Sequence, residues 1–422
     1  MIQYPQMDRT RLPDCTLRNH TVAVTQLLVV ANSFDAENIE NDLIPKLIST
    51  DEMGKIIVWN LLTRRPMVDT SIPTGASITA IQLLASKYLV CLSKDYTLRI
   101  LDWNNLIEKP LFEMNVNTMN FANFTISIDK DEKNFVLCCC NTQDAEAIDI
   151  YQINIKTSKL TRLFNHIDFH SIIKDNLILS LDKKVPDKLG MIMKFEQDLR
   201  SNTIFIGFES GIIIGFQIDS EMLKIIYLST SHFPEPVLDI QVVGGLKDVT
   251  GTLISSSTNN IIIKHTYPIS ETITNRIKMN NIFKSSDLTP STPQTIEVKG
   301  TKIAHIAEFE NHLIWATWNG KLFIKDTYSG VIHKYKRSKG NIRPNESSQG
   351  SISKNQYENK EPRYVKLGAM AIFKSTSLSA VKDIKSLVVM NRSSQRRLDQ
   401  FISHSWSFVG YNDGTISLYQ IE

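Results

Sequence analysis

Few residues in this sequence could do chemistry, and their spacing matches no known type of site. The chain has nine histidines, with no HExxH pair among them. His166 and His170 stand four residues apart, but in a strand or loop this spacing does not aim two ligands at one metal ion. Neither a GxxxxGK(S/T) phosphate loop nor a GxSxG nucleophile turn occurs. We therefore predict no catalytic residue, no metal or cofactor site, and no enzyme.

Recurring aspartates are the one feature that could suggest paired carboxylates. Asp51, Asp95, Asp144 and Asp413 each follow an apolar run and precede a turn. Aspartate hydrogen-bonds the backbone of its own turn and is favoured there for that reason. We expect these four side chains to be structural rather than catalytic.

The cysteines favour a reduced, intracellular protein. There are five, and Cys138, Cys139 and Cys140 are consecutive. An odd number with three in a row is a poor disulfide framework, and neighbouring strand residues point to opposite faces. We expect them to be small buried side chains. No apolar run reaches the roughly 18 residues of a membrane span, and the first residues lack the pattern of a secretory signal.

These residues are positioned by a repeated sequence pattern. Each copy has a buried strand, a polar turn and a second strand in which apolar and polar residues alternate. The clearest copy runs from Phe408 to Ile421, where Asn412, Asp413 and Gly414 make the turn. Six earlier copies are Leu47–Trp59, Leu89–Ile100, Phe135–Tyr151, Ile204–Phe216, Leu253–Lys264 and Leu313–Ile324. The first two turns are 42 residues apart, which is the length of a WD-type repeat at roughly 40–45 residues.

Seven such units predict an all-β fold, a single seven-bladed WD-repeat-type β-propeller over 1–422. Apolar segments upstream predict the inner strands at 22–30, 78–84, 116–124, 191–195, 237–243, 303–309 and 368–373. The predicted blades span about 20–63, 76–103, 115–153, 189–218, 236–267, 300–327 and 364–421. A strand over 14–18 is expected to pair with the C-terminal strand, complete the seventh blade and close the ring. The tryptophans Trp59, Trp103, Trp315, Trp318 and Trp406 are expected in the core or between blades.

Polar insertions interrupt the repeat at about 268–299, 330–362 and 376–405, and 154–188 reads as an irregular outer segment. The composition of 341–361 predicts disorder. Residues 381–388 and 396–402 have the spacing of a short amphipathic helix. Nine Lys and Arg against three Glu occur in 331–366, and five against two Asp in 376–405, although the whole chain carries only +3. Arg392, Arg396 and Arg397 could form a partner contact; a merely solvated face is the alternative.

The repeats resemble WD repeats in a degenerate form. Trp59-Asn60 stands where Trp-Asp is usual, and Asn19-His20 is the one candidate for the Gly-His opening. For that reason we do not expect the hydrogen-bond network that WD repeats build from this His and an Asp. Within WD proteins the chain is similar to the fungal ASTRA-associated proteins. The stretches that carry this similarity are Cys15–His20, Val58–Pro66, Leu92–Ile100, Asn117–Phe124, Ala147–Ile153, Gly207–Gly211 and Gly410–Ile416.

The resemblance implies a non-enzymatic scaffold of the ASTRA complex. Its implied partners are the co-chaperone trio that matures phosphatidylinositol-3-kinase-related kinases, a kinase-related transcription cofactor, a pair of AAA+ ATPases and the other ASTRA subunits. It also implies a role in chromatin remodelling and a place in the nucleus, with the cytoplasm as a further location. The alternatives are an adaptor of another complex, a propeller that binds nucleic acid through its basic insertions, and an enzyme with a site at the channel mouth. The low net charge makes direct nucleic-acid binding the weaker expectation.

Overall fold

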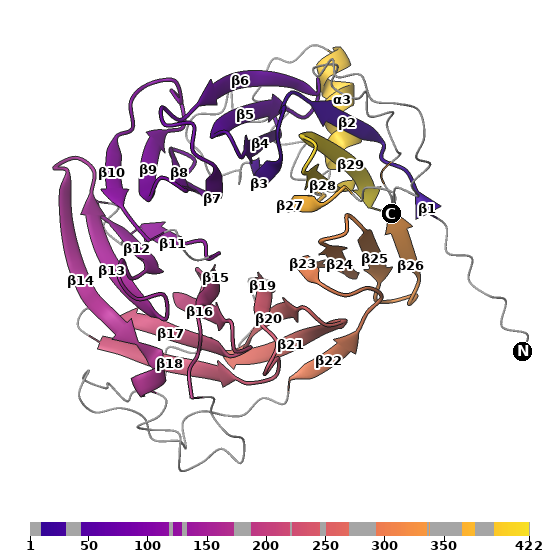
Figure 1. Cartoon of the computed structure of the whole chain (residues 1–422). Coiled ribbons are helices and arrows are strands. Elements are labelled where there is room, and N and C mark those ends of the chain that lie inside the picture. The colour runs from indigo at the N-terminus through magenta and orange to yellow at the C-terminus, as the bar shows by residue number, and fades with distance from the viewer. Residues whose placement is uncertain are drawn as a thin grey trace, which may run out of the picture.

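Seven small antiparallel sheets are arranged as blades around a central axis in the computed structural model (Figure 1). The structure describes residues 10–30, 44–117, 121–128, 133–172, 187–219, 222–244, 250–269, 293–335, 337, 365–375 and 392–421. Within these ranges no helix is both long and apolar enough to cross a bilayer. The fold is the predicted seven-bladed β-propeller.

Each blade has four strands, ordered from the axis outward. The inner strands are β3 (Val24–Val30), β7 (Ile78–Leu84), β11 (Thr125–Ile128), β15 (Ile192–Asp198), β19 (Val237–Val243), β23 (Ile303–Phe309) and β27 (Leu367–Phe373). The second strands are β4 (Lys46–Asp51), β8 (Tyr88–Ser93), β12 (Phe135–Cys140), β16 (Thr203–Phe208), β20 (Thr250–Ser257), β24 (His312–Thr317) and β28 (Ser405–Tyr411).

The two outer layers complete each sheet. The third strands are β5 (Lys55–Asn60), β9 (Thr97–Asp102), β13 (Ala147–Asn154), β17 (Ile213–Asp219), β21 (Ile261–Pro268), β25 (Leu322–Asp326) and β29 (Thr415–Ile421). The outermost strands are β6 (Arg65–Ser71), β10 (Phe112–Asn115), β14 (Lys159–Asp168), β18 (Met222–Ser229), β22 (Gln294–Glu297), β26 (Ile332–Tyr335) and β2 (Cys15–Arg18).

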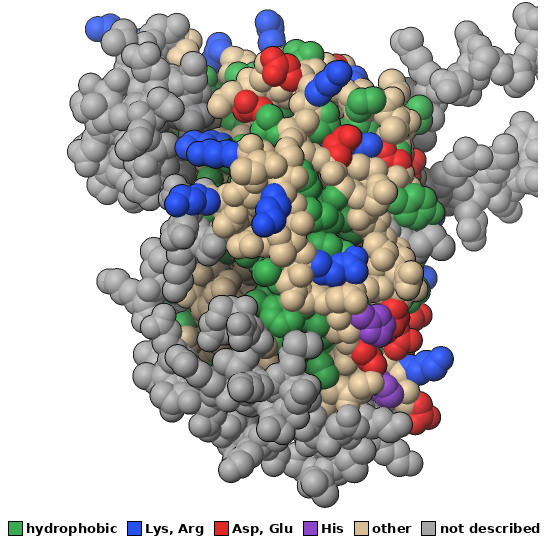
Figure 2. All heavy atoms as spheres, turned by 90° about the vertical axis from the view of Figure 1, so that its left-hand side faces the viewer, with side chains coloured by type: hydrophobic (Ala, Val, Ile, Leu, Met, Phe, Trp, Pro, Cys, Tyr) green, Lys and Arg blue, Asp and Glu red, His purple; other side chains and the backbone are tan. Residues whose placement is uncertain are grey.

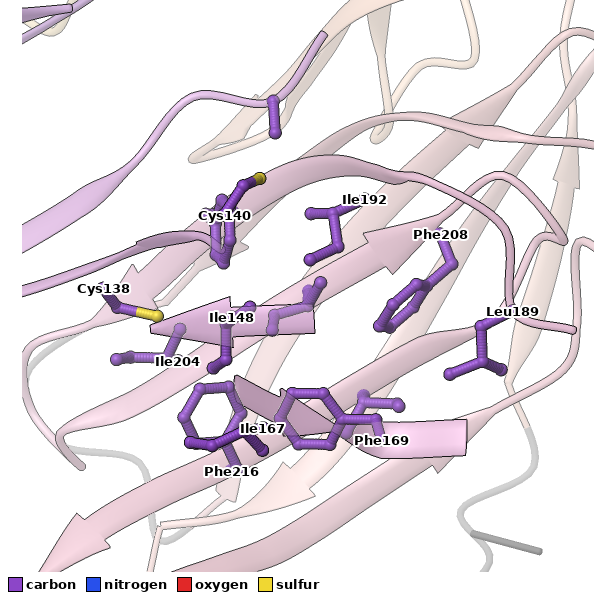
Figure 3. Packing of buried hydrophobic residues seen from close by; sticks show 14 of the residues in the cluster. Cys138, Cys140, Ile148, Ile167, Phe169, Leu189, Ile192, Ile204, Phe208 and Phe216 are labelled. Carbon is purple, nitrogen blue, oxygen red and sulfur yellow. The ribbon is translucent and has the colours of Figure 1, made fainter. Parts of the chain in front are cut away.

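The core lies between blades, because each blade is covered on both sides by its neighbours. Second strands are therefore buried along their whole length, as in β16 and β28. Figure 3 shows blades three and four, where Ile148, Ile167 and Phe169 point toward Ile192 and Phe216 of the next blade. Each fully buried side chain of this size contributes about 1.5–3 kcal/mol, so stacked blades stabilise one another.

The ring closes as predicted, by pairing the two ends of the chain. β2 runs antiparallel to β29, with Thr16 opposite Ser417. The Asp14 carboxylate accepts a hydrogen bond from the Gln420 amide at 2.8 Å, which extends the pairing past the strand. The short strand β1 (Thr10–Arg11) adds in parallel to β26 of the sixth blade. The N-terminal segment therefore ties blade seven to blade six.

Several strands lie where the sequence pattern did not predict them: β1, β6, β10 and β18 lie largely or wholly outside the predicted blades, and four others differ as follows. The inner strand of blade three is β11 at Thr125–Ile128, not 116–124, because asparagines in that segment bind the backbone of a neighbouring loop and of β15. Asn117 donates to the Asn141 carbonyl, and Asn123 pairs with the backbone of Phe195. The outermost strands β14, β22 and β26 occupy segments that were expected to be insertions. Most of the predicted disordered stretch 330–362 lies outside the described residues.

Candidate partner-binding surfaces and their supporting networks

A buried polar network anchors the first blade to the loop that follows the closing strand. His20 Nδ1 lies 2.7 Å from Asp51 Oδ2, and His20 Nε2 lies 2.7 Å from Ser49 Oγ. The Trp59 indole donates to the same serine at 2.8 Å. This is the WD-type network that was not expected from the sequence. Asn19-His20 does stand for the Gly-His opening, and Asp51 supplies the acid from the end of β4.

Asp51 also caps its own turn, as predicted. Its Oδ1 accepts hydrogen bonds from the amides of Met53 and Lys55. Burial alone would raise the pKa of this carboxyl, but the hydrogen bonds from His20 and the turn amides lower the pKa below its usual range. Asp144 and Asp413 likewise accept from amides of their own turns.

Asp95 is different from the other three aspartates. It receives hydrogen bonds from the hydroxyls of Ser93 and Thr74 and pairs with Arg99 at 2.6 Å. Arg99 also contacts Glu113 on β10. Asp95 therefore has a structural role, as expected, and its carboxylate joins strands of the second blade to the preceding loop.

Blade five carries an incomplete version of the blade-one network. His232 Nε2 lies 2.8 Å from Ser255 Oγ, which lies 2.6 Å from His265 Nε2. His265 takes the place of the tryptophan and pairs through Nδ1 with the Tyr227 hydroxyl at 2.7 Å. Ser257, at the end of β20, stands where blade one has Asp51. Among the described residues, His232 Nδ1 and Ser257 Oγ are buried without a hydrogen-bond partner.

Burial keeps both blade-five imidazoles neutral at physiological pH. It lowers the pKa of His232 to about 4 and the pKa of His265 to about 3, and the second is lowered further by the neighbouring His232. Neither imidazole therefore presents a positive charge to a binding partner. The role of this network is to hold β20 and β21 together.

Four ionisable side chains, Lys194, Glu196, Asp239 and His305, lie on the inner strands β15, β19 and β23. Lys194 Nζ is 2.9 Å from Asp239 Oδ1, and the other oxygen of Asp239 accepts from the Ile306 amide at 3.0 Å. Burial raises the pKa of Glu196 to about 7 and lowers the pKa of His305. These contacts join β15, β19 and β23 of successive blades. The described part of the chain holds no group of three or more His, Cys, Asp or Glu placed to bind a metal ion.

Four of the five cysteines and most tryptophans are placed as predicted, whereas Cys15 on β2 is only partly buried. Cys91, Cys138, Cys139 and Cys140 are buried free thiols, and burial raises the pKa of Cys91 to about 12. Trp59, Trp103, Trp315 and Trp406 are buried as well. Trp318 is the exception, because 44% of it is exposed. The prediction that this side chain packs in the core or between blades is wrong.

The predicted amphipathic helix is α3 (Arg392–Ile402), which stands beside β2 and β29 (Figure 1). Leu398, Phe401 and Ile402 form its buried face. The ring of Phe401 stacks on Trp406 with centroids 5.3 Å apart, and the Trp406 indole donates to the Phe401 carbonyl. The helix is thereby fixed to blade seven. The second helical segment predicted at 381–388 lies outside the described residues.

The three arginines proposed as a contact lie on α3 and are all exposed. Arg392, Arg396 and Arg397 point away from the buried face, and no described carboxylate forms an ion pair with them. The structure thus brings them together on one rigid element. Whether a partner binds there stays a prediction.

Turns and loops form a second continuous surface, which we call the turn face. It consists of the turns between second and third strands together with the loops that enter the inner strands. Backbone hydrogen bonds link the two kinds of segment around the ring, including Glu52 to Ala23, Lys94 to Ser77, Glu209 to Met191 and Asn412 to Lys366. The turns are residues 52–54, 94–96, 141–146, 209–212, 258–260, 318–321 and 412–414.

Near β10 and β14, the side chains on the outer side of the ring do not form a patch of one charge. In Figure 2 basic, acidic and apolar side chains are interspersed on that side, and acidic residues gather with histidines at its lower right. His166 Nε2 and Asp144 Oδ2, both on partly exposed side chains, are 3.0 Å apart. The two ends of the blades therefore offer better-defined candidate surfaces than this outer side.

Comparison with known proteins gives one consistent result. A family model described as ASTRA-associated protein 1 matches residues 13–419. A protein of that name from Zygosaccharomyces rouxii is 33% identical over 419 residues, covering 98% of this chain and 100% of the relative. A Kluyveromyces lactis protein of that name is 32% identical and covers 96% and 97% of the two chains. A Saccharomyces cerevisiae protein of that name is 30% identical over 451 residues and covers 97% of each.

Proposed function

The chain belongs to the ASTRA-associated protein 1 family, and from that premise we propose that it is a non-enzymatic scaffold subunit of an ASTRA complex. The proposal rests on a closed seven-bladed ring whose sequence matches the family model from residue 13 to residue 419. A closed ring is stiff, and it offers several separate surfaces on which other proteins can bind at once.

The fold supports docking on both ends of the blades. α3 ends at Ile402, just before β28 begins at Ser405, whereas the turn at 412–414 follows the other end of β28. A strand of seven residues spans about 23 Å. Two partners, one on α3 and one on the turn face, could therefore bind without competing for the same space.

We propose as partners the co-chaperone trio of the phosphatidylinositol-3-kinase-related kinases, the kinase-related transcription cofactor, the paired AAA+ ATPases and other ASTRA subunits. A role in chromatin remodelling and a place in the nucleus are part of the same proposal. Support for these finer assignments comes from the family alone. The propeller supports only the more general role of binding other proteins.

Tagged purification from native extract, with nuclease added and with mass spectrometry as the readout, tests the proposal. We expect the co-chaperone trio to be recovered at moderate salt. Replacing Arg392, Arg396 and Arg397 with glutamine should reduce the recovery of at least one subunit. Replacing Lys109, Lys156 and Lys159, which are also exposed, is the matched control. Recovery of an unrelated complex would refute the assignment and leave the fold unaffected.

Direct nucleic-acid binding is the second candidate, favoured by the three exposed arginines on α3. It predicts an affinity for DNA or RNA that falls steeply with salt, because each neutralised phosphate releases counterions. Filter binding at two salt concentrations with the same glutamine variant distinguishes the candidates. A partner set that survives nuclease treatment favours the scaffold.

A further inference from the structure

One position recurs in all seven blades, and only blade six fills it with an apolar side chain. It is the residue that directly follows the second strand, at the start of the turn on the turn face. In the other six blades this residue is polar: Glu52, Lys94, Asn141, Glu209, Thr258 and Asn412. In blade six it is Trp318, which is 44% exposed although Trp315, three residues earlier, is fully buried. Packing within the propeller therefore does not account for an indole here.

The backbone around Trp318 is fixed from both sides. Its amide donates to the Lys302 carbonyl at 3.1 Å, and its own carbonyl accepts from the Leu367 amide at 3.2 Å. Within the turn, the Gly320 amide donates to Thr317 at 2.9 Å. These bonds tie the turn to the loops that enter β23 and β27. The indole is therefore presented on a rigid support, and little conformational freedom would be lost when a partner covers it.

Basic residues lie on the backbone segments that adjoin Trp318. Lys302 and Lys366 belong to the two segments that hold the backbone of Trp318, and Lys321 ends the same turn. All three are exposed. Within the described part of the chain, none of the three ammonium groups forms an ion pair with a carboxylate. We call Trp318 with these three lysines the Trp318 corner.

We propose that the Trp318 corner is the docking site for an acidic segment of a partner protein, in which aspartate or glutamate side chains flank an apolar one. The apolar side chain would pack on the indole, and the carboxylates would pair with the lysines. Tryptophan is enriched among residues that dominate binding energy, and complementary charge sets orientation and specificity. The inference rests on the proposed scaffold function in one respect, since it names the chemistry of one partner of that scaffold.

Blade two provides a matched comparison. Its turn carries Tyr96, which is 50% exposed, next to Lys94. There, however, the intervening Asp95 pairs with Arg99, and the preceding loop contributes Ser77 in place of a lysine. An exposed aromatic residue therefore occurs in both turns, and the group of basic residues occurs only in blade six. Changes at Lys94 and Tyr96 serve as controls for the same changes at the Trp318 corner.

Fluorescence anisotropy of a labelled peptide tests the corner in the purified full-length protein. The probe is an octapeptide in which glutamates flank one leucine and one phenylalanine. The comparisons are the same peptide with lysine for glutamate, and a single-stranded oligonucleotide of equal charge. We expect the acidic peptide to bind and the basic peptide not to bind. Trp318→Ala should weaken binding roughly 5- to 30-fold, whereas Trp318→Phe should retain most of it.

Charge variants separate the role of the lysines from the role of the indole. The double change Lys302→Glu and Lys321→Glu should weaken binding about tenfold, because attraction becomes repulsion at two positions. Lys94→Glu and Tyr96→Ala should leave binding within about twofold. Melting temperatures of all variants establish that each is folded. Equal binding by wild type and Trp318→Ala, or tighter binding by the oligonucleotide with the same lysine dependence, would overturn the proposal.

Purified complexes provide a second arm that separates this inference from the proposed function. If wild type recovers ASTRA subunits, the Trp318→Ala variant should lose one of them while the glutamine variant of α3 retains it. Unchanged recovery of all subunits with Trp318→Ala would refute docking at the Trp318 corner but not the scaffold function. If wild type recovers no such subunits, the proposed function is wrong. The peptide experiment then still tests whether the Trp318 corner binds acidic segments.

Discussion

Replacing Asp51 tests whether the blade-one network holds the ring together. In Asp51→Asn the oxygen that faces His20 Nδ1 becomes an NH2 group, so that two donors meet at 2.7 Å. The side chains of His20 and Asp51 are 0% and 1% exposed, so water cannot replace the lost acceptor. Breaking a buried, hydrogen-bonded charged contact from one side costs about 3–5 kcal/mol. We expect the free energy of unfolding to fall by about 3 kcal/mol, the lower end of this range, because the amide oxygen of the new side chain can still accept hydrogen bonds from the turn amides.

Asp144→Asn is the matched control. Asp144 also accepts from an amide two residues on, at Glu146, and also pairs with a histidine, His166. However, its side chain is 37% exposed and that of His166 is 50% exposed, so water can replace the lost contact. We expect a cost of less than about 1 kcal/mol.

Urea unfolding followed by tryptophan fluorescence measures both variants, and calorimetry gives the melting temperature. For a chain of this length, ~3 kcal/mol lowers the melting temperature by about 3–4 °C. The folded-state pKa of Asp51 is lowered, so its contribution is present above the unfolded pKa and is lost as pH falls through the folded value. The gap between wild type and Asp51→Asn should therefore shrink below about pH 4. Equal costs for Asp51→Asn and Asp144→Asn would refute the reasoning.

Three further predictions concern other parts of the ring. His232 and His265 have pKa values of about 4 and 3, so below about pH 6.5 the unfolded chain binds protons that the folded chain does not. Urea titrations should show each histidine contributing a fall in stability of roughly 1.4 kcal/mol per pH unit, and His265→Gln should reduce the slope by that amount. Gly320→Ala places a Cβ 2.2 Å from the Val365 carbonyl oxygen at a φ of +75°, so the free energy of unfolding should fall by more than about 2 kcal/mol, on the order of a strained backbone. Gly330→Ala, where nothing lies within 4 Å of the new Cβ, should lower it by about 1 kcal/mol. Phe401→Ala should cost about 3–4 kcal/mol and raise hydrogen exchange in α3, while a loss of stability without faster exchange there would contradict the proposed anchoring of the helix.

Strands near the axis could be predicted from the sequence because both faces are buried. β7 and β19 were expected with the bounds that the structure has. Outermost strands lack this signal: β14 is exposed at most of its ten residues, and β22 is exposed at three of its four. Their pairing depends on the backbone of the third strand, which side-chain patterns do not record. Residues 116–124 were misassigned because apolar residues alternate there with asparagines that bind backbone groups.

The candidate surfaces were predictable to different degrees. α3 was expected because Leu398, Phe401 and Ile402 recur at helical spacing, although Arg392, which was proposed as a contact together with Arg396 and Arg397, lies before the predicted segment 396–402 and is the first residue of the helix. The network around His20 was missed because Asn19 replaces the usual glycine, although the histidine itself marked the position. Trp318 was misread because a tryptophan near a strand is usually packed. The signal that could have identified it was the comparison of equivalent turn positions, which needs the end of each second strand to be known.

The constraints on the turn of blade six explain how one surface can be both rigid and variable. Gly320 must be glycine, because its backbone conformation and the nearby Val365 carbonyl leave no room for a side chain. Trp318, in contrast, has its amide and carbonyl bonded to neighbouring loops, and its side chain points outward with no role in that bonding. A residue other than proline, which lacks the amide hydrogen, could therefore occupy position 318 and keep these backbone bonds, as the polar residues of the other blades indicate. An indole that is 44% exposed on a polar turn leaves a large apolar surface in water, so we infer that binding, rather than folding, accounts for its presence.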